Sequence, residues 1–196
     1  MKVSMPAALL VGGASQRLGR DKGALPYGAG TLAEFQTRRL SAIFSEVWLA
    51  AKHPPAYAFG PARVLLDDTE DRAAIHGLRR VLREAEDRVF VLAVDLPALS
   101  NGLIAEIARR GLATRSAALL PRAEGRLQPL AAVWRREALT EADRRVAHGE
   151  LSLRGLAEAV AAEVFPEEEW RAIDPSGNAF LNMNTLEEYA FLRERA

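Results

Sequence analysis

Residues 10–22 read Leu10-Val-Gly-Gly-Ala-Ser-Gln-Arg-Leu-Gly-Arg-Asp-Lys22, and they follow an apolar run, Pro6 to Val11, that predicts a buried first strand. Gly12 and Gly13 allow the backbone to adopt positive φ and to approach a ligand closely. Successive N–H groups in such a turn can bind phosphate oxygens. Because doubly wound sheets bind ligands at the carboxyl ends of their strands, this loop is the first candidate for a nucleotide site.

The charges of the loop favour an anion site. Arg17, Arg20 and Lys22 stand against the single acid Asp21. The loop is not a Walker A motif, because two residues separate Gly19 from the lysine, and the dinucleotide fingerprint Gly-x-Gly-x-x-Gly is absent. The alternative is an ordinary strand-to-helix turn whose charges are solvated.

Short apolar runs alternate with longer amphipathic ones along the rest of the chain, which predicts an α/β fold with a mainly parallel sheet. Thr31 with Glu34 has the spacing of a capping box, and Ser100 is suited to cap a helix that runs to Arg110, with Gly111 as its stop. Further strands are expected at residues 46–51, 63–66, 89–94, 116–120 and 127–134, and helices at 32–44, 75–85, 100–110, 135–147, 152–161 and from about Leu186, with a loop at 53–62.

Composition excludes several functions. The chain has 196 residues, which fits one domain spanning 1–196, and its 26 Lys and Arg residues balance 26 Asp and Glu residues, so no global field draws it to nucleic acid or to an acidic membrane. The absence of cysteine excludes disulfides and thiol catalysis. His53, His76 and His148 are expected in loops or at the surface. No run is apolar enough for a membrane span or a signal peptide, so a soluble cytoplasmic protein is expected.

Candidate metal ligands follow the clearest strand, Val89 to Val94. Asp95 ends this strand, and oxygen ligands of this kind are those that Mg²⁺ prefers; the alternative is a turn or helix-capping aspartate. Asn182 and Asn184 stand two apart, so in extended backbone their side chains face the same way. Thr185 and Glu188 also fit a capping box, so this segment could be only a helix start.

Gln128 and Pro129 interrupt an apolar run. Proline forfeits a hydrogen bond of the ladder and is unusual in a central strand. Either the run is an edge strand or these residues serve an acceptor substrate.

These motifs together resemble the molybdenum cofactor guanylyltransferases, within the wider group of nucleotidyltransferases that make nucleoside diphosphate sugars and cytidyl intermediates. The resemblance covers nearly the whole chain. It rests on segments that occur in the expected order: residues 10–22, Asp68, Val94–Pro97, Gly125–Leu130, Gly149–Arg154 and Asn182–Glu188.

The resemblance implies a Rossmann-like nucleotidyltransferase fold with three layers, α/β/α, around a mainly parallel sheet. It also implies GTP as substrate, Mg²⁺ as cofactor and molybdopterin carrying molybdenum as acceptor. The implied reaction transfers GMP to the terminal phosphate of the pterin and releases pyrophosphate. Molybdoenzymes or other cofactor-assembly proteins are possible partners, whereas nucleic acid and membranes are not expected.

The resemblance also implies roles for individual residues. Lys22 is a compact charge and Arg17 a planar fork, both suited to phosphates that gain charge during transfer. The expected catalytic residues are Arg17, Lys22 and Asp95; the nucleotide contacts are Leu10, Val11, Gly12, Gly13, Ser15, Lys22, Asp68 and Asp95; the metal ligands are Asp95 and Asn184; and the acceptor contacts are Gln128, Pro129, Arg154 and Asn182.

Three segments depart from the family pattern. Leu18 replaces a usual methionine, residues 50–52 read Ala-Ala-Lys where an asparagine is common, and residues 73–77 read Ala-Ala-Ile-His-Gly in place of Gly-Pro-Leu-Ala-Gly. The last two segments lie on the expected base side of the nucleotide. A cytidylyltransferase, a sugar-phosphate nucleotidyltransferase and a non-catalytic nucleotide-binding carrier of the cofactor are therefore the alternatives.

Overall fold

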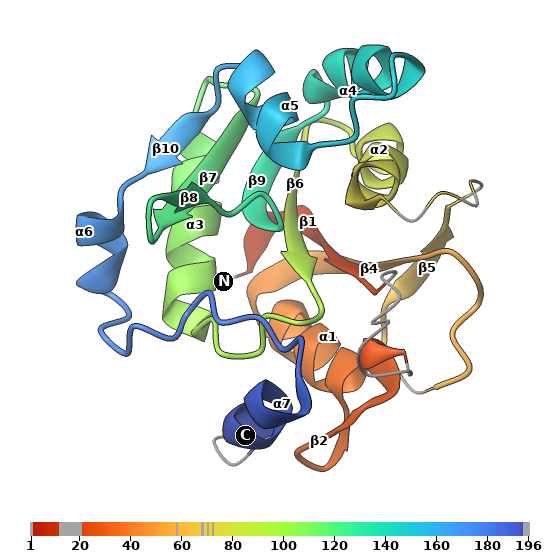
Figure 1. Ribbon diagram of the computed structural model, residues 1–196, viewed down its shortest axis with the longest axis vertical. Coiled ribbons are helices and arrows are strands. Elements are labelled where there is room, and N and C mark those ends of the chain that lie inside the picture. The colour runs from red at the N-terminus through yellow and green to blue at the C-terminus, as the bar shows by residue number, and fades with distance from the viewer. Residues whose placement is uncertain are drawn as a thin grey trace.

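A sheet forms the middle of the molecule, with helices against both of its faces (Figure 1). The computed structural model describes residues 2–11, 21–57, 59–67, 69, 71 and 73–193. Five of the residues predicted to belong to the site lie outside these ranges: Gly12, Gly13, Ser15, Arg17 and Asp68.

The strands of this sheet follow one another in the order β10-β7-β9-β6-β1-β4-β5, and β8 pairs with β7 off this path. Their bounds are β1 Val3–Leu10, β4 Phe44–Ala51, β5 Arg63–Leu66, β6 Arg88–Ala93, β7 Ala118–Ala123, β8 Arg126–Leu127, β9 Ala131–Arg135 and β10 Glu163–Phe165. A separate small hairpin consists of β2 (Pro26–Tyr27) and β3 (Gly30–Thr31).

Most strands run in one direction. β1 is parallel to β4 and β6, β4 is parallel to β5, and β7 is parallel to β10, whereas β9 is antiparallel to both of its neighbours. In this register Leu9 lies opposite Leu49 on one side and Leu92 on the other. The prediction of a mainly parallel sheet is confirmed. The carboxyl ends of β1, β4, β5 and β6 consequently meet at one edge, which is where such sheets bind ligands.

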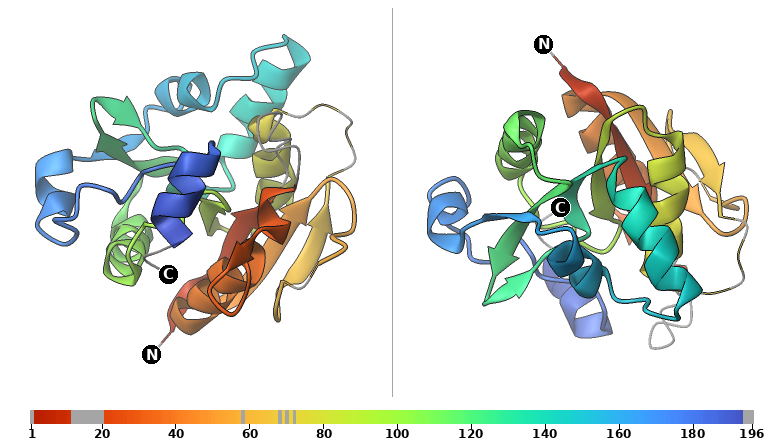
Figure 2. Two further views of the ribbon diagram at one scale, coloured as in Figure 1. Left: turned by 60° about the horizontal axis from the view of Figure 1, so that its bottom comes forward. Right: turned by 90° about the horizontal axis from the view of Figure 1, so that it is seen from above.

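Two groups of helices cover the sheet, and Figure 2 shows them on its opposite sides. α1 and α3 pack on one face, while α2, α4 and α5 pack on the other. The helices are α1 Leu32–Ile43, α2 Ala74–Glu84, α3 Asn101–Ala113, α4 Ala138–Ala147, α5 Leu153–Ala159, α6 Glu167–Arg171 and α7 Leu186–Arg193, with a short 3-10 helix, η1, at Lys22–Ala24.

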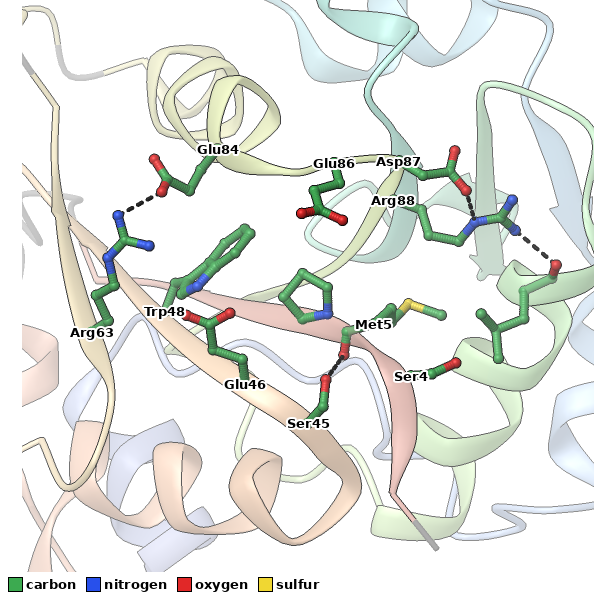
Figure 3. Close-up of a pocket in the computed structure, with 12 residues that line it drawn as sticks. Ser4, Met5, Ser45, Glu46, Trp48, Arg63, Glu84, Glu86, Asp87 and Arg88 are labelled. Atoms are coloured by element: carbon green, nitrogen blue, oxygen red, sulfur yellow. Dashed lines mark hydrogen bonds and ion pairs between the residues drawn. The ribbon is translucent and has the colours of Figure 1, made fainter.

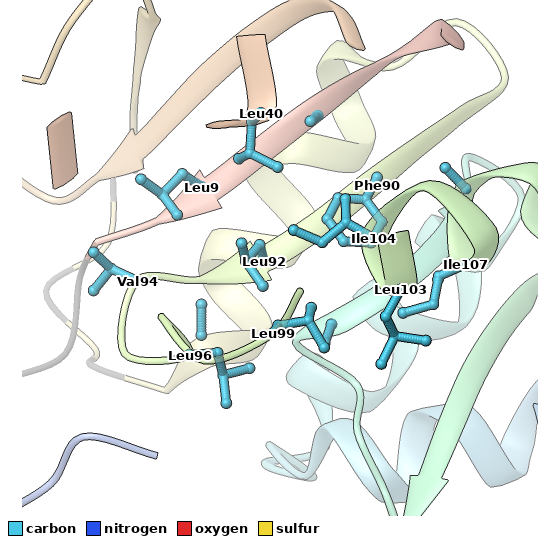
Figure 4. Close-up of a cluster of buried hydrophobic side chains, with 14 of the residues drawn as sticks. Leu9, Leu40, Phe90, Leu92, Val94, Leu96, Leu99, Leu103, Ile104 and Ile107 are labelled. Atoms are coloured by element: carbon cyan, nitrogen blue, oxygen red, sulfur yellow. The ribbon is translucent and has the colours of Figure 1, made fainter. Parts of the chain in front are cut away.

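Alternation along the strands builds two cores. Leu9 and Leu92 face α1 and α3, whereas Leu10 and Val91 face α2. Figure 4 shows the first core, where Leu92 and its neighbours on the strands meet side chains of α1 and α3. Complete burial of one such aliphatic or aromatic side chain contributes roughly 1.5–3 kcal/mol. The rings of Phe44 and Phe90 stack there with centroids 5.1 Å apart.

Gly111 does not stop α3, contrary to the prediction. The helix continues to Ala113, and Gly111 lies inside it, where a Cβ would collide with the side chain of Val133 on β9. Glycine is present because helix and strand approach closely at this position, and not because the chain needs positive φ there.

The single strand predicted at residues 127–134 is also wrong. β8 ends at Leu127, and β9 begins at Ala131 and lies between β6 and β7 in the interior of the sheet. Gln128 and Pro129 lie in the turn between them, where Ala131 donates its backbone N–H to the Gln128 carbonyl over 3.2 Å. Because Pro129 lies in this turn, its missing N–H interrupts no hydrogen-bond ladder of the sheet. Pro129 therefore belongs to neither an edge strand nor a central strand.

His76 is buried, with 6% of its surface exposed, rather than at the surface as predicted. It lies on α2, whose inner face follows the helical period, and its Nε2 is 3.4 Å from Oδ2 of Asp71. His53 and His148 are exposed as expected. β10 and α6 were not predicted, because they are only 3 and 5 residues long and too short to show a period.

The other expected elements are confirmed with small shifts of their ends. Thr31 caps α1 by accepting from the Glu34 N–H over 3.0 Å, and Ser100 caps α3 by accepting from the Leu103 N–H over 3.2 Å. Within the described ranges, none of the helices has the length and apolar character that a bilayer span requires.

Candidate active site

Three of the predicted site residues meet at the carboxyl edge of the sheet. The Lys22 ammonium donates to Oδ2 of Asp95 and to Oδ1 of Asn184, in both cases over 2.7 Å. These residues come from the first loop, from the end of β6 and from the segment before α7. The Lys22 and Asp95 side chains are 11% and 20% exposed, so the pair is partly shielded from water yet still reachable by a ligand.

η1 positions Lys22. Asp21 caps this turn, because its carboxylate accepts from the Gly23 N–H over 2.9 Å. The Tyr57 hydroxyl lies 3.4 Å from the same carboxylate, and burial together with Asp21 raises the pKa of Tyr57. A Cβ on Gly23 would lie 2.7 Å from Cζ of Tyr57, so the turn and this ring fit only with glycine between them.

Asp95 lies two residues beyond β6. Val94 extends the sheet by donating its N–H to the Leu10 carbonyl over 3.0 Å, and the Asp95 carbonyl accepts from the Met183 N–H over 2.9 Å. The N-cap of the next helix is Ser100, so Asp95 does not cap it. The carboxylate is therefore directed to Lys22 from a backbone fixed on both sides.

Asn184 is held by a helix start. The Glu188 carboxylate accepts from the Asn184 and Thr185 N–H groups over 2.7 and 2.9 Å, and the Thr185 hydroxyl accepts from the Glu188 N–H over 3.1 Å. The capping box predicted as an alternative is thus real. It does not compete with a role for Asn184, because it uses backbone and leaves the amide side chain directed to Lys22.

The hairpin β2–β3 fastens α7 next to the site. The Tyr27 hydroxyl donates to the Leu192 carbonyl over 3.0 Å, and the Tyr189 hydroxyl donates to the Pro26 carbonyl over 2.6 Å. The loop that contains Lys22 leads directly into this hairpin. The hairpin and the C-terminal helix therefore hold each other next to the site.

The donor set at Lys22 fits a hard divalent cation. Asp95 and Asn184 direct two oxygen atoms at one positive group, and Mg²⁺ prefers oxygen ligands. The part of the chain that the structure describes contains no group of three or more His, Cys, Asp or Glu side chains arranged to hold a metal. A metal that takes one or two side-chain oxygens and completes its shell with phosphates and water fits such a pair.

A cavity of about 310 Å³ adjoins Asn184. Three of the four predicted acceptor residues, Gln128, Arg154 and Asn182, line it. Pro129 does not line it, and its carbonyl instead accepts from the indole N–H of Trp134 over 2.9 Å. The remaining lining residues include Arg126, Trp170, Arg171, Phe180 and Glu188.

Two guanidinium groups in this cavity have no acidic partner among the described residues. Arg126 and Arg154 form no ion pair there, whereas Arg171 lies 2.7 Å from Glu167. Most other arginines of the described ranges pair with a carboxylate, as Arg144 does with Glu141. Arg126 belongs to the segment Gly125–Leu130 that the family resemblance singles out, although only Gln128 and Pro129 of that segment were predicted individually as acceptor contacts.

Leu10 and Val11 lie at the end of β1, where the Val11 N–H donates to the Ala50 carbonyl over 3.0 Å. Leu10 lines a small hollow together with Ala50, Ala51, Lys52, Asp67, Ala73, Ala74 and Gly77. Most of its lining comes from the two segments that depart from the family pattern, residues 50–52 and 73–77.

Lys52, at the edge of that hollow, forms hydrogen bonds to Asp67, Thr69 and Asp71. Its ammonium donates to the Thr69 carbonyl over 2.9 Å and to the Asp71 carbonyl, and it lies 3.4 Å from the Asp67 carboxylate. Asp67 was not among the predicted site residues, although it lies directly after β5, at the kind of strand end that identified Asp95. The neighbouring Asp68 lies outside the described residues.

A larger cavity of about 620 Å³ lies at the opposite, amino edge of the sheet, and Figure 3 shows the side chains around it. It begins at the first residues of β1, β4 and β6, and no predicted site residue lines it. Arg63 is 2.5 Å from Glu84 and Arg88 is 2.7 Å from Asp87, so these charges pair with one another. Its size alone does not make it the active site.

Comparison with known proteins shows which family and which solved structures this chain resembles. The model of the MobA-like NTP transferase domain matches residues 7–164. A probable molybdenum cofactor guanylyltransferase of Mycobacterium avium (strain 104) is 32% identical over 178 residues, covering 87% of this chain and 90% of that protein. A protein of the same name from Mycobacterium tuberculosis (strain ATCC 25618 / H37Rv) is 34% identical over 163 residues, covering 80% and 81%.

Solved structures show the same fold. The molybdopterin-guanine dinucleotide biosynthesis protein A of Archaeoglobus fulgidus superposes with a TM-score of 0.84 at 22% identity, covering 97% of this chain and 98% of that one. The 2-C-methyl-D-erythritol 4-phosphate cytidylyltransferase of Thermus thermophilus gives a TM-score of 0.67 at 20% identity, covering 100% and 98%.

The protein is thus a nucleotidyltransferase with a Rossmann-like α/β fold. Within that class the chain belongs to the MobA-like NTP transferase family, whose model matches the chain from the middle of β1 into β10.

Proposed function

We propose that this protein transfers GMP from GTP to the terminal phosphate of molybdopterin carrying molybdenum, with Mg²⁺ as cofactor. Membership of the MobA-like family and the names of the mycobacterial relatives support the substrates. The observation that carries the proposal is the meeting of Lys22, Asp95 and Asn184 at the carboxyl edge of the sheet. Nucleotidyl transfer needs a fixed cation for the phosphates and oxygen ligands for a metal at one place, and these three residues supply both.

In the proposed reaction an oxygen of the acceptor phosphate attacks the α-phosphorus of GTP. A new P–O bond forms while the bond from the α-phosphorus to the bridging oxygen breaks, and pyrophosphate leaves with that electron pair. The chain contributes orientation and charge stabilisation and forms no covalent intermediate.

Lys22 is proposed to bind the phosphates and to stabilise the charge that accumulates on the pyrophosphate. Asp95 and Asn184 are proposed to hold Mg²⁺, which when bound would neutralise phosphate charge beside the α-phosphorus. The oxygens that accept from Lys22 are already directed at one cation, so they need little rearrangement. Contacts of Leu10, Val11, Gly12, Gly13, Ser15, Arg17 and Asp68 with the nucleotide stay predictions.

The cavity beside Asn184 is proposed to receive the acceptor. Its unpaired guanidinium groups, Arg126 and Arg154, suit a phosphate, and the partly exposed Phe180, packed on the buried Trp170, supplies aromatic surface for a flat ring system. Gln128 and Asn182 offer amides to the polar edge of such a ring. Asn184 lines this cavity and is also one of the two proposed metal ligands, so an acceptor phosphate here would lie beside the nucleotide.

Pyrophosphate release tests the proposal directly. The wild-type protein with GTP, Mg²⁺ and molybdenum-loaded molybdopterin should release pyrophosphate, and Asp95→Asn should reduce the rate by a factor of about 10²–10³, the usual cost of removing one transition-state contact. Arg38→Ala is the matched control, because Arg38 is an exposed residue of α1 that pairs with Glu34. A wild-type protein that releases no pyrophosphate would instead support a non-catalytic carrier.

Nucleotide choice needs a separate measurement. Thermal-shift titrations with GTP, CTP and UTP in the presence of Mg²⁺ should show the largest stabilisation with GTP, since only ligands that bind the native state raise the melting temperature. Preference for CTP would assign a cytidylyltransferase.

A further inference from the structure

The loop that carries Asp95 is held from the side by helix α1. This loop, residues 94–100, joins β6 to α3 and contains Pro97. The Gln36 amide on α1 donates from Nε2 to the Val94 carbonyl over 3.3 Å. Arg39, one helical turn further on, donates from Nη1 to the Pro97 carbonyl over 2.9 Å. These two carbonyls lie immediately before Asp95 and two residues after it.

Arg39 also binds acceptors at the end of this loop and at the first residue of α3. Its Nη2 donates to the Leu99 carbonyl, and its Nε donates to Oδ1 of Asn101 over 2.9 Å. The guanidinium also donates to Oε1 of Gln36 over 3.0 Å, so the two side chains brace each other. Among the described residues, the hydrogen bonds that these two side chains make outside α1 all go to residues 94–101.

Gln36 and Arg39 are largely shielded from water, so loss of their hydrogen bonds would cost folding free energy. Gln36 is completely buried, and the Arg39 guanidinium lies 5.0 Å from the centroid of the Phe35 ring. Burial lowers the pKa of Arg39 to about 10, and the group stays charged at neutral pH. A buried amide or guanidinium is tolerated only when it is hydrogen-bonded, so removal of either side chain leaves partners without a bond.

We propose that Gln36 and Arg39 are positioning residues that fix the Asp95 carboxylate where it binds the metal. The inference rests on the proposed function, because it takes Asp95 as a metal ligand. Asp95 has its own carbonyl held by Met183, and α1 supplies the constraints on its two sides. A displacement of about 1 Å at a reacting group can lower the reaction rate 10²-fold. If the loop were held on one side only, the Asp95 carboxylate would be placed less accurately and would bind the metal more weakly.

Metal binding gives a readout independent of turnover. Mn²⁺ serves as the probe, and the full-length protein is titrated with it in the presence of GTP and without acceptor. Binding is measured in electron paramagnetic resonance as the decrease of the free Mn²⁺ signal. We expect Gln36→Met and Arg39→Met to raise the dissociation constant of Mn²⁺ about tenfold, the lower end of the range for residues that orient metal ligands. Arg39→Lys, which keeps the charge, should fall between Arg39→Met and wild type.

Controls separate positioning from general stability. Arg38→Met changes the neighbouring residue of the same helix, which is exposed and bonds only to Glu34 in the described ranges, and it should bind Mn²⁺ as wild type does. Catalysis should agree: the Mg²⁺ concentration for half-maximal pyrophosphate release should rise about tenfold in Gln36→Met and Arg39→Met, while the rate at saturating Mg²⁺ recovers to within a few fold. A purely structural role would lower the melting temperature and leave both metal constants unchanged.

Asp95→Asn, measured beside these variants, distinguishes two failures. If Asp95→Asn loses Mn²⁺ and the α1 variants bind it normally, the positioning role is wrong and the proposed metal site stands. If Asp95→Asn binds Mn²⁺ as wild type does, the proposed metal site is wrong, and the positioning role fails with it. Should Arg39→Met not fold, Gln36→Met and Arg39→Lys decide the question by the same criteria.

Discussion

Nζ of Lys22 donates to Oδ1 of Asn184 over 2.7 Å, although 162 positions separate the two residues in the sequence. The first loop and the segment before α7 thus close one site, and neither supplies it alone. Met183 strengthens this closure, because it is completely buried and its N–H binds the Asp95 carbonyl.

Asn184→Ala should weaken Mg²⁺ binding without unfolding α7. The amide side chain bonds to Lys22, whereas the helix start uses the Asn184 N–H, which alanine retains. We expect the Mg²⁺ concentration for half-maximal pyrophosphate release to rise about tenfold or more. Asn182→Ala is the control: Asn182 lines the acceptor cavity, so its replacement should change the acceptor KM and leave metal dependence intact. Equal metal dependence in both variants would remove Asn184 from the metal shell.

Arg154→Ala should raise the KM for the acceptor and leave the KM for GTP unchanged. Its guanidinium lines the cavity without an acidic partner in the described ranges, and a hydrogen bond to a charged group contributes about 1.5–3 kcal/mol, which corresponds to roughly 10- to 100-fold. Steady-state kinetics with each substrate varied in turn measure both constants. Arg144→Ala, which removes an arginine paired with Glu141 on the surface, should change neither. An acceptor KM that stays constant in Arg154→Ala would move the acceptor elsewhere.

Much of the fold could be predicted because its signals are local. The strand ahead of residue 12, the caps at Thr31 and Ser100 and the apolar stripe of α2 each lie within one element, and the structure confirms them. Gly111 was misjudged because its reason is Val133, which β9 brings against the helix from 22 positions away in the sequence.

The candidate site also contains residues that local sequence signals identify and residues that they do not. Lys22, Asp95 and Asn184 could be named because glycine-rich turns, strand ends and a family resemblance identify them. Arg39 and Lys52 could not, because their main acceptors are backbone carbonyls, which every residue possesses and which leave no trace in a sequence.

Gly111→Ala should destabilise the protein even though alanine is the better helix former. A Cβ at this position would collide with Val133, and overpacking of this kind costs roughly 1–3 kcal/mol, more than the about 1 kcal/mol that helix propensity returns. Gly102→Ala is the matched control in the same helix, since its Cβ would lie an ordinary 3.7 Å from Cγ2 of Ile173, and it should stabilise by roughly 0.5–1 kcal/mol. Urea unfolding of the three proteins measures the differences. Stabilisation by both substitutions would mean that α3 and β9 are not in close contact.

Glu106 on α3 should contribute stability that disappears in acid. Hydrogen bonds from Arg109, with further help from Arg110, lower the pKa of Glu106 from 4.5 to about 2. The folded state therefore favours the charged carboxylate, and its contribution is present above pH 4.5 and lost as the pH falls towards 2. Because the cluster is close to the surface, we expect Glu106→Gln to cost less than about 1 kcal/mol at pH 7.

Urea unfolding at pH 7 and pH 3 should show that the difference in unfolding free energy between wild type and variant is smaller at the lower pH. Glu158→Gln, an exposed residue with no ion pair in the described ranges, should change stability little at pH 7. A gap for Glu106→Gln that stays constant or widens in acid would show that its carboxylate is not held by these arginines.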